Sequence, residues 1–338
     1  MMKINAKNLP KKEDDLLQFL VDYFPGKDIR IVEQDDNYID VSLSNHGSSD
    51  YYIDPNILEG LQWWDQSILI EEIPNQFRNL VKYQLSLNDN WTIYSWSLWL
   101  EQRFLENDIP NEIIILHIDD HTDCMSPLLF KEGNVFINPF NNEEVNLFNP
   151  TTVKQAIENG VISIGSFMTL FMHSMPRIQF RHLMPKHRLS NAHVSGKVNR
   201  EFLSDNTIPP YQERPLLSFS PSGGIKSNVE YSVFTEIDDF LKDISDTAAI
   251  LLHVDMDYFN NRFDGDSDWR SHAFNHDPSA ELVYKNIEQV FSAIEKSNIA
   301  KRIENYTVAL SPGFFPAEFW NESISIINRI LIENHEYY

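Results

Sequence analysis

Apolar residues recur along this chain with two spacings, one typical of helices and one typical of strands. Helical spacing appears first at residues 14–24, and two short runs that alternate apolar and polar residues follow at 29–33 and 38–43. Turn-forming residues then predominate in SNHGSSD, residues 44–50. These elements predict a small N-terminal α+β extension over residues 1–80.

Over residues 81–338, predicted strands and helices alternate. We expect strands at 83–87, 113–118, 248–254 and 306–310, and helices at 93–105, 152–159, 234–244, 279–295 and 316–332. The runs IIILHI (113–118) and AAILLHV (248–254) are apolar at almost every position, which is typical of strands buried on both faces. The alternation therefore predicts an α/β fold with three αβα layers and a mainly parallel sheet.

Both of these buried strands lead into acidic and imidazole side chains, which read DDHTD at 119–123 and DMD at 255–257. Side chains two residues apart in a strand point to the same side, so the first and third residues of each segment should face a common point. The carboxyl ends of parallel strands meet at one edge of a sheet, where open α/β sheets bind their ligands. The sequence therefore predicts one site at this edge.

Several unpaired carboxylates buried together are costly unless they are protonated or share a cation. A divalent metal is the simplest explanation, and its expected ligands are Asp119, His121, Asp123, Asp255 and Asp257. Carboxylates with an imidazole suit Mn²⁺ best, with Fe²⁺ and Zn²⁺ as alternatives, and the cluster is large enough for one or two ions. A lone D-x-H or D-x-D motif is usually a turn or a helix cap, but two motifs on separate strands favour a metal site.

Other polar residues near these motifs receive structural interpretations. His117 and His253 each precede a motif by two residues, so we expect buried, hydrogen-bonded histidines beneath the site rather than ligands. The acidic residues of 264–268 lack the final glutamate of a calcium loop, and we expect a solvated loop near the mouth of the site. Cys124 has no evident base partner and is expected to be a small buried residue, not a nucleophile.

The composition restricts the partners. The formal net charge of −23 disfavours nucleic acid and anionic membranes and favours cations or a basic substrate. A single cysteine excludes an intramolecular disulfide, and no apolar run approaches the roughly 20 residues that span a bilayer. The first residues contain no apolar signal core, so we expect a cytoplasmic protein. The sequence does not indicate an oligomeric state.

The DDHTD segment resembles the D-x-H-x-D motif of the arginase–deacetylase superfamily, and DMD resembles its D-x-D motif. Within that superfamily, HIDDHTD together with ISIGSF (162–167), DMDYF (255–259) and TVALSPGF (307–314) looks most like the peptide arginases. The resemblance extends over roughly residues 85–335. It implies a hydrolase that converts arginine side chains in a ribosomally made precursor peptide to ornithine, with release of urea.

The resemblance also implies a role for each residue of the two motifs. Asp119 and Asp255 would bridge two Mn²⁺ ions, Asp123 would complete the first site, and His121 and Asp257 would complete the second. Hydroxide held between the ions would attack the guanidinium carbon, and Asp123 would accept its proton. Asp119, Asp123 and Asp255 are accordingly the expected catalytic residues.

One feature departs from the family pattern. Relatives have a histidine ligand for the first metal upstream of D-x-H-x-D, whereas NDNWTIYSW (88–96) contains no histidine, and Trp91 or a close neighbour is the equivalent position. Asp89 or Asn90 is the alternative ligand. The sequence therefore leaves open whether the protein holds one ion or two.

Two other functions remain open at this point. A deacetylase-like amide hydrolase keeps one metal, which Asp119, His121 and Asp255 would hold, but such enzymes use a pair of histidines, and no such pair is evident. A catalytically inactive relative would use the cleft only to bind a peptide. For a peptide arginase, the N-terminal extension could hold the precursor peptide. Trp91, Trp96 and Trp99 could line the cleft, although three aromatic residues on one helix are more often core.

Overall fold

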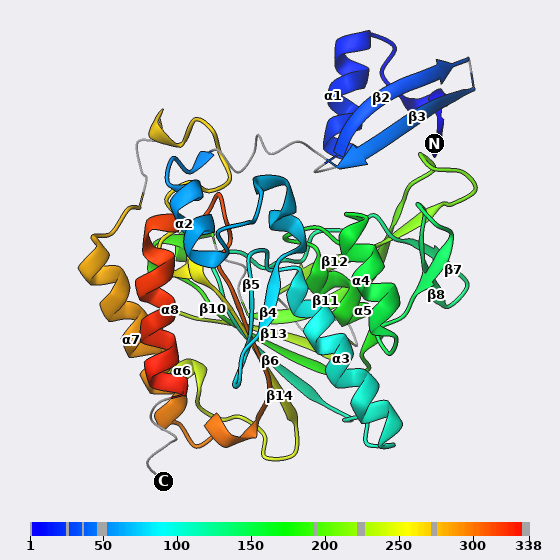
Figure 1. Ribbon diagram of the computed structural model, residues 1–338. Helices are drawn as coiled ribbons and strands as arrows, with labels where there is room; N and C mark the ends of the chain where they lie inside the picture. The colour runs from blue at the N-terminus through cyan, green and yellow to red at the C-terminus, as the bar shows by residue number, and fades with distance from the viewer. Residues whose placement is uncertain are drawn as a thin grey trace.

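The computed structural model describes residues 2–24, 27–35, 37–45, 53–191, 195–221, 227–271 and 276–332. Its centre is a nine-stranded sheet with helices on both sides (Figure 1). The strand order is β12 (Glu213–Ser220), β11 (Gly196–Ser204), β13 (Val229–Phe234), β10 (Ile178–Leu183), β6 (Ile113–Ile118), β14 (Ala249–Asp255), β15 (Ile303–Ala309), β5 (Gln84–Ser86) and β4 (Phe77–Asn79). Neighbours from β13 to β5 pair in parallel, and β12, β11 and β4 pair antiparallel at the two ends. The fold is mixed α/β with a large, mostly parallel sheet, compatible with three αβα layers.

The continuous apolar runs of the central strands are explained by burial on both faces. In β6, Ile113 and Ile115 belong to one hydrophobic cluster, whereas Ile114 and Leu116 belong to another. The helices that supply the first cluster are α3 (Trp91–Leu105), α4 (Pro150–Glu158) and α5 (Phe167–Ser174), and those that supply the second are α7 (Ala280–Lys296) and α8 (Trp320–Leu331). These two groups of helices lie on opposite sides of the sheet in Figure 1.

The strands predicted from apolar runs are confirmed as β5, β6, β14 and β15, and they are neighbours in the sheet. The helix predicted at 234–244 is wrong over most of its length, because β13 extends to Phe234 and α6 covers only Ile237–Phe240. Strand β10 was not predicted, since polar residues interrupt its sequence IQFRHL. One of them, Arg181, donates to the carbonyl groups of Asp239, Phe240 and Lys242, so tertiary contacts stabilise a strand that the pattern does not predict.

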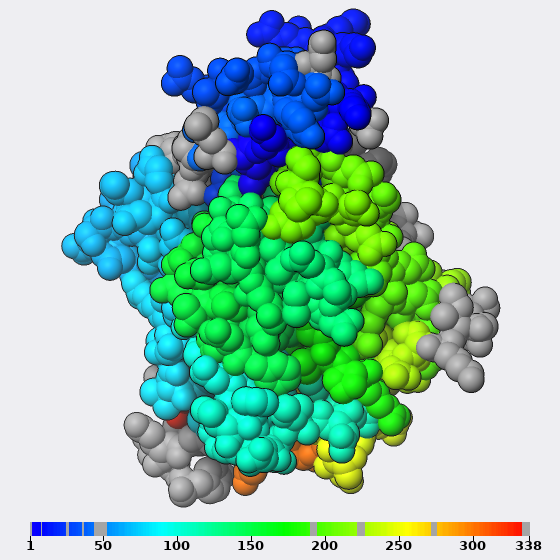
Figure 2. All heavy atoms as spheres, turned by 90° about the vertical axis from the view of Figure 1, so that its right-hand side faces the viewer, coloured from blue at the N-terminus to red at the C-terminus, as the bar shows by residue number. Residues whose placement is uncertain are grey.

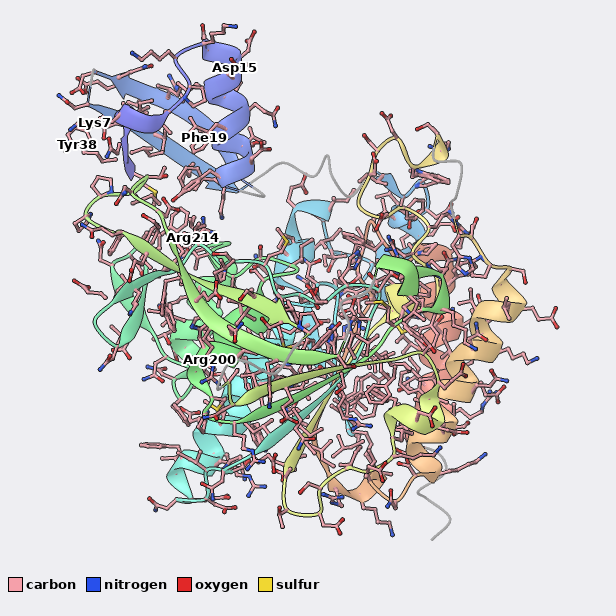
Figure 3. The ribbon with its side chains drawn as sticks, turned by 180° about the vertical axis from the view of Figure 1, so that it is seen from behind. Lys7, Asp15, Phe19, Tyr38, Arg200 and Arg214 are labelled. Atoms are coloured by element: carbon pink, nitrogen blue, oxygen red, sulfur yellow. The ribbon has the colours of Figure 1, made fainter. Side chains whose placement is uncertain are left out.

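The N-terminal residues form a separate lobe at one end of the molecule (Figures 1 and 2). It comprises α1 (Glu13–Tyr23) and an antiparallel sheet in the order β1 (Met2–Asn5), β3 (Tyr38–Asn45) and β2 (Lys27–Gln34). The Tyr23 hydroxyl donates to Asp205 at 2.8 Å, and Arg214, labelled below the lobe in Figure 3, also contacts Asp205. Of the remainder of residues 1–80, α2 (Ile57–Trp64) packs against η8 (Ala317–Phe319) and α8, and β4 is part of the main sheet.

The remaining elements are short. A third sheet contains β7 (Phe130–Glu132), β8 (Val135–Asn138) and β9 (Glu143–Val145). The other 3-10 helices are η1 (Ala6–Asn8), η3 (Ile70–Asn75), η4 (Lys186–Asn191), η5 (Met256–Tyr258), η6 (Trp269–Ser271) and η7 (Ala300–Arg302). Within the described ranges, none of the helices combines the length and the apolar character needed to cross a membrane.

The contact between α2 and the C-terminal elements can be tested at Gly60. A Cβ atom there would lie 2.7 Å from Cβ of Ala317 and 2.7 Å from the indole of Trp320. We expect Gly60→Ala to lower the free energy of unfolding, because overpacking costs about 1–3 kcal/mol and exceeds the gain of about 1 kcal/mol in helix propensity. Urea denaturation measures the change, with the exposed Glu59→Ala on the same helix as control. An unchanged or higher stability of Gly60→Ala would contradict this packing.

Candidate metal centre

The predicted site residues meet at the carboxyl ends of β6 and β14, which are adjacent parallel strands. Asp255 ends β14, and Asp257 lies in the short helix η5 that follows it. Asp119, His121 and Asp123 lie in the segment directly after β6. The four carboxylates are at most 5% exposed, so the structure places closely spaced acidic groups in the interior, as the sequence predicted.

Turns, not strand alternation, bring the paired residues together. Oδ1 of Asp119 accepts a hydrogen bond from the backbone N of His121 at 2.6 Å, and Oδ1 of Asp255 accepts one from the backbone N of Asp257 at 3.0 Å. The prediction that each pair continues its strand is therefore wrong. Aspartate readily bonds the backbone two residues on, and this turn ends the strand as soon as the acidic residue is reached.

Among the described residues the potential ligand atoms form three groups, and two of these groups share Asp119. The third contains Asp120, His121 and Asp264 and lies nearer the surface. The buried His/Asp residues of the two groups that share Asp119 could hold a metal ion. In the outer group, Nδ1 of His121 lies 2.9 Å from Oδ2 of Asp257 and 3.7 Å from Oδ1 of Asp119. The inner group contains His117, Asp119, Asp123 and His253. Nε2 of His117 lies 3.5 Å from Oδ2 of Asp119 and 3.6 Å from Oδ2 of Asp123. Asp119 thus presents one oxygen to each group.

Buried oxygen atoms without partners support a cation at this position. Among the described residues, Oδ2 of Asp119, Oδ2 of Asp123 and Oδ1 of Asp89 are buried and have no hydrogen-bond partner. Burial, followed by the charges of Asp257 and Asp255, raises the pKa of Asp119 well above its usual range. Burial likewise raises the pKa of Asp123, and the neighbouring acidic groups add to the effect. A bound cation would relieve both the desolvation and the repulsion, so these residues fit a metal.

Asp255 belongs to the same cavity but lies outside all three ligand groups found among the described residues. Its Oδ2 accepts a hydrogen bond from the hydroxyl of Ser311, and its Oδ1 caps Asp257. Ser311 adopts φ +45° and Asp123 adopts φ +52°, a left-handed conformation that is unusual for residues other than glycine. Such backbone strain is concentrated at functional sites. Here it holds two cavity residues in position.

The cavity at the site has a volume of about 400 Å³ and is open to solvent. Acidic residues form one part of its wall, and Met125, Ile164, Pro312 and Phe314 form an apolar part. Met125 is 68% exposed and Ile164 is 42% exposed, so they lie at its rim. The cavity can accept a side chain that combines an apolar stem with a cationic end.

Two histidines support the carboxylates from below. His117 and His253 are fully buried and stacked, with their Nδ1 atoms 3.0 Å apart. Nε2 of His117 lies 3.0 Å from the carbonyl oxygen of His121, and because a carbonyl can only accept, this nitrogen carries the proton. Nδ1 of His117 must then accept from His253. Burial lowers the pKa of His253 to about 3, so this imidazole is neutral.

The expectation of buried, hydrogen-bonded histidines is therefore confirmed. The contact between the two histidines was not predicted, because they are 136 positions apart and meet only through the pairing of β6 with β14. Neither histidine lines the cavity.

A carboxylate outside the cavity orients His121. Oδ1 of Asp264 lies 3.4 Å from Nε2 of His121, and Nη2 of Arg188 lies 3.0 Å from the same oxygen. The hydrogen bond from His121, together with the charge of Arg188, lowers the pKa of Asp264 to about 2. Residues 264–268 were predicted to be a solvated loop near the mouth, and Asp264 is indeed partly exposed. Its contact with the imidazole was not predicted, since nothing in the local sequence indicates it.

The burial of the other residues considered from the sequence indicates which of their expected roles the structure supports. Trp91, Trp96 and Trp99 are at most 8% exposed and do not line the cavity. Their interpretation as core residues is therefore confirmed, and the alternative that they line the cleft is not supported. Burial raises the pKa of the Cys124 thiol well above its usual range, which disfavours a nucleophilic role. Asp89 is 4% exposed and lines the cavity, whereas Asn90 is buried beside it.

Comparison of the sequence with protein-family models and with curated proteins gives no match.

Raised carboxylate pKa values predict an unusual pH dependence for the metal-free protein. Burial raises the pKa of Asp89 to about 7, and Asp119 and Asp123 shift in the same direction. The folded state then binds more protons than the unfolded state between about pH 4 and pH 7, so stability falls as pH rises through this range. Thermal unfolding in a chelator should show a higher midpoint at pH 5 than at pH 7.5, with a smaller difference for Asp119→Asn. An equal difference in both proteins would contradict the shift at this site.

The contact between Asp264 and His121 predicts an effect on metal affinity. Asp264→Asn removes the carboxylate that orients the imidazole, and loss of such a partner typically weakens metal binding about 10–100-fold. Mn²⁺ titration by calorimetry measures this change, with the exposed Asp268→Asn in the same loop as control. Equal affinity in the two variants would show that Asp264 does not position His121.

Proposed function

We propose that this protein is a manganese-dependent hydrolase with an arginase–deacetylase-like fold. It converts arginine side chains in a ribosomally made peptide to ornithine and releases urea. The observation that carries the proposal is the position of Asp119, which presents its two carboxylate oxygens to two groups of ligand atoms at an open cavity. This arrangement suits a centre of two ions that share a carboxylate.

The donor set supports the choice of metal. Carboxylate oxygens with one accessible imidazole suit Mn²⁺, and Fe²⁺ and Zn²⁺ are alternatives by ligand type. Asp119, His121 and Asp257 would hold one ion, Asp123 would contribute to the other, and Asp255 lies beside both. When bound, the ions would supply a water activated for attack on carbon at neutral pH.

The residues of this chain would bind and orient the arginine side chain. Its aliphatic stem would contact the apolar wall that includes Met125, Ile164 and Phe314, and its guanidinium group would lie among the carboxylates. The buried carboxylate of Asp123 is placed to hold the proton released by the attacking water, because its Oδ2 has no other partner among the described residues. The excess of acidic residues throughout the chain would attract a basic peptide.

The N-terminal lobe would bind a further part of the peptide. Strand β2 is one of the two outer strands of its sheet, and among the described residues no strand pairs with its other edge, so an extended peptide can pair there. The neighbouring helix α1 has acidic residues in its first turn and two exposed apolar residues, Leu17 and Val21. These features suit a peptide that contains both basic and apolar residues.

The structure disfavours the deacetylase alternative as a mechanism. That chemistry needs a histidine pair that reaches the substrate, and the pair found here is fully buried beneath the carboxylates. An inactive peptide-binding protein would not need several closely spaced carboxylates in its cavity, because their burial is costly without a cation.

The direct test is incubation of the purified protein with Mn²⁺ and the precursor peptide, or a panel of arginine-containing peptides. Mass spectrometry should show conversion of arginine to ornithine, with an equivalent amount of urea. Asp119→Asn and Asp255→Asn should each reduce the rate by about 10²-fold or more, since loss of a ligand is at least as damaging as loss of its supporting partner. Asp268→Asn should retain activity. Unchanged peptide masses, with metal confirmed in the protein, would reject the arginase assignment.

A further inference from the structure

We infer that the carboxylate of Asp89 completes the inner cation site. This inference rests on the metal centre of the proposed function and concerns which residues build it. The inner site would then contain only oxygen ligands, from Asp89, Asp119 and Asp123, whereas the outer site includes the imidazole of His121.

The main chain places Asp89 beside Asp255. The segment that carries Asp89 follows β5, whose carboxyl end lies at the same edge of the sheet as those of β14 and β15. The carbonyl oxygen of Leu87 accepts a hydrogen bond from the backbone N of Ser311 at 2.8 Å. The hydroxyl of Ser311 in turn donates to Asp255. These two hydrogen bonds connect the segment of Asp89 with Asp255.

A second path connects Asp89 with Asp123. Oδ2 of Asp89 accepts a hydrogen bond from the backbone N of Gly165 at 3.4 Å. The carbonyl oxygen of Gly165 accepts one from the backbone N of Met125 at 2.9 Å, two residues after Asp123. Asp89, Asp123 and Asp255 all line the same cavity. The three carboxylates therefore face a common space.

The side chain of Asp89 also has an atom available for a cation. It is 4% exposed, and within the described part of the chain its Oδ1 has no hydrogen-bond partner. In the same part of the chain, Oδ1 of the adjacent Asn90 also has no partner, but Asn90 does not line the cavity. Its Nδ2 donates to the carbonyl oxygen of Ile162 at 3.0 Å and anchors the loop. A buried carboxylate oxygen without a partner, on a fixed loop, is suited to ligate a cation.

The histidine beneath the site does not replace the missing nitrogen ligand. Nε2 of His117 is close to Asp119 and Asp123, but it donates its proton to the carbonyl oxygen of His121. Its lone pair lies on Nδ1, which accepts from His253. Nδ1 of His253, which lies 3.8 Å from Oδ2 of Asp119, carries the proton that it donates to His117. With these ring nitrogens of both histidines engaged, carboxylates are the ligands that remain, and such a set favours hard cations such as Mn²⁺ and Mg²⁺ over Zn²⁺.

The test is the number of Mn²⁺ ions per chain, measured by elemental analysis and by calorimetric titration of the full-length protein. We expect two ions in the wild type and one in Asp89→Ala. Asp89→Asn, which preserves the shape of the side chain, should weaken the inner site at least about 10-fold, because the amide loses the carboxylate charge. Asp89→His should restore the second ion, since it places an imidazole on the same loop. The exposed Asp268→Ala is the matched control and should retain two ions.

Electron paramagnetic resonance provides an independent measurement. The wild type loaded with Mn²⁺ should show the spectrum of two coupled ions, and Asp89→Ala should show that of an isolated ion. A single ion in the wild type, or two tightly bound ions in Asp89→Ala, would overturn the inference. Both readouts are independent of catalysis, so two ions that depend on Asp89 without peptide conversion would reject only the arginase assignment.

Discussion

Repulsion among buried carboxylates is the constraint on which the rest of this structure depends. Asp119, Asp123, Asp255 and Asp257 lie close together at the ends of two adjacent strands, and water is largely excluded from them. Without a counter-charge they tend to bind protons, because burial and the neighbouring carboxylates raise their pKa values. With a cation they become ligands. A metal ion bound here would replace these protons, so the stability of the metal-free protein and its metal affinity would depend on pH in opposite directions.

The surrounding protein holds the carboxylates in place with many weak contacts. Backbone N–H groups of His121, Asp257 and Asp120 donate to Asp119, Asp255 and Asp257 respectively, and the hydroxyl of Ser311 also donates to Asp255. The neutral histidine pair lies beneath, where its rings fill space without adding charge. These contacts fix geometry but leave particular oxygens without partners, which is the arrangement that metal coordination requires.

The outer loops are connected to the same centre. Arg188 contacts both Asp120 and Asp264, and Asp264 contacts the imidazole of His121. A chain of charged contacts thus runs from the exposed rim to the outer group of ligand atoms. Changes at the rim can thereby alter the orientation of the His121 imidazole.

The sequence by itself determined the buried central strands, because uninterrupted apolar runs are stable only when both faces of a sheet are covered. It also determined the acidic motifs at their ends, since each motif is local in the chain. Only the tertiary structure decided what lies far apart in the sequence. Strand β10 depends on contacts such as those of Arg181, and the pair of His117 and His253 depends on strand order. Asp89 and Asp264 reach the site from other segments. Pairing between distant segments leaves no pattern in the local sequence. The residues that these segments bring to the site can therefore be identified only from the folded structure.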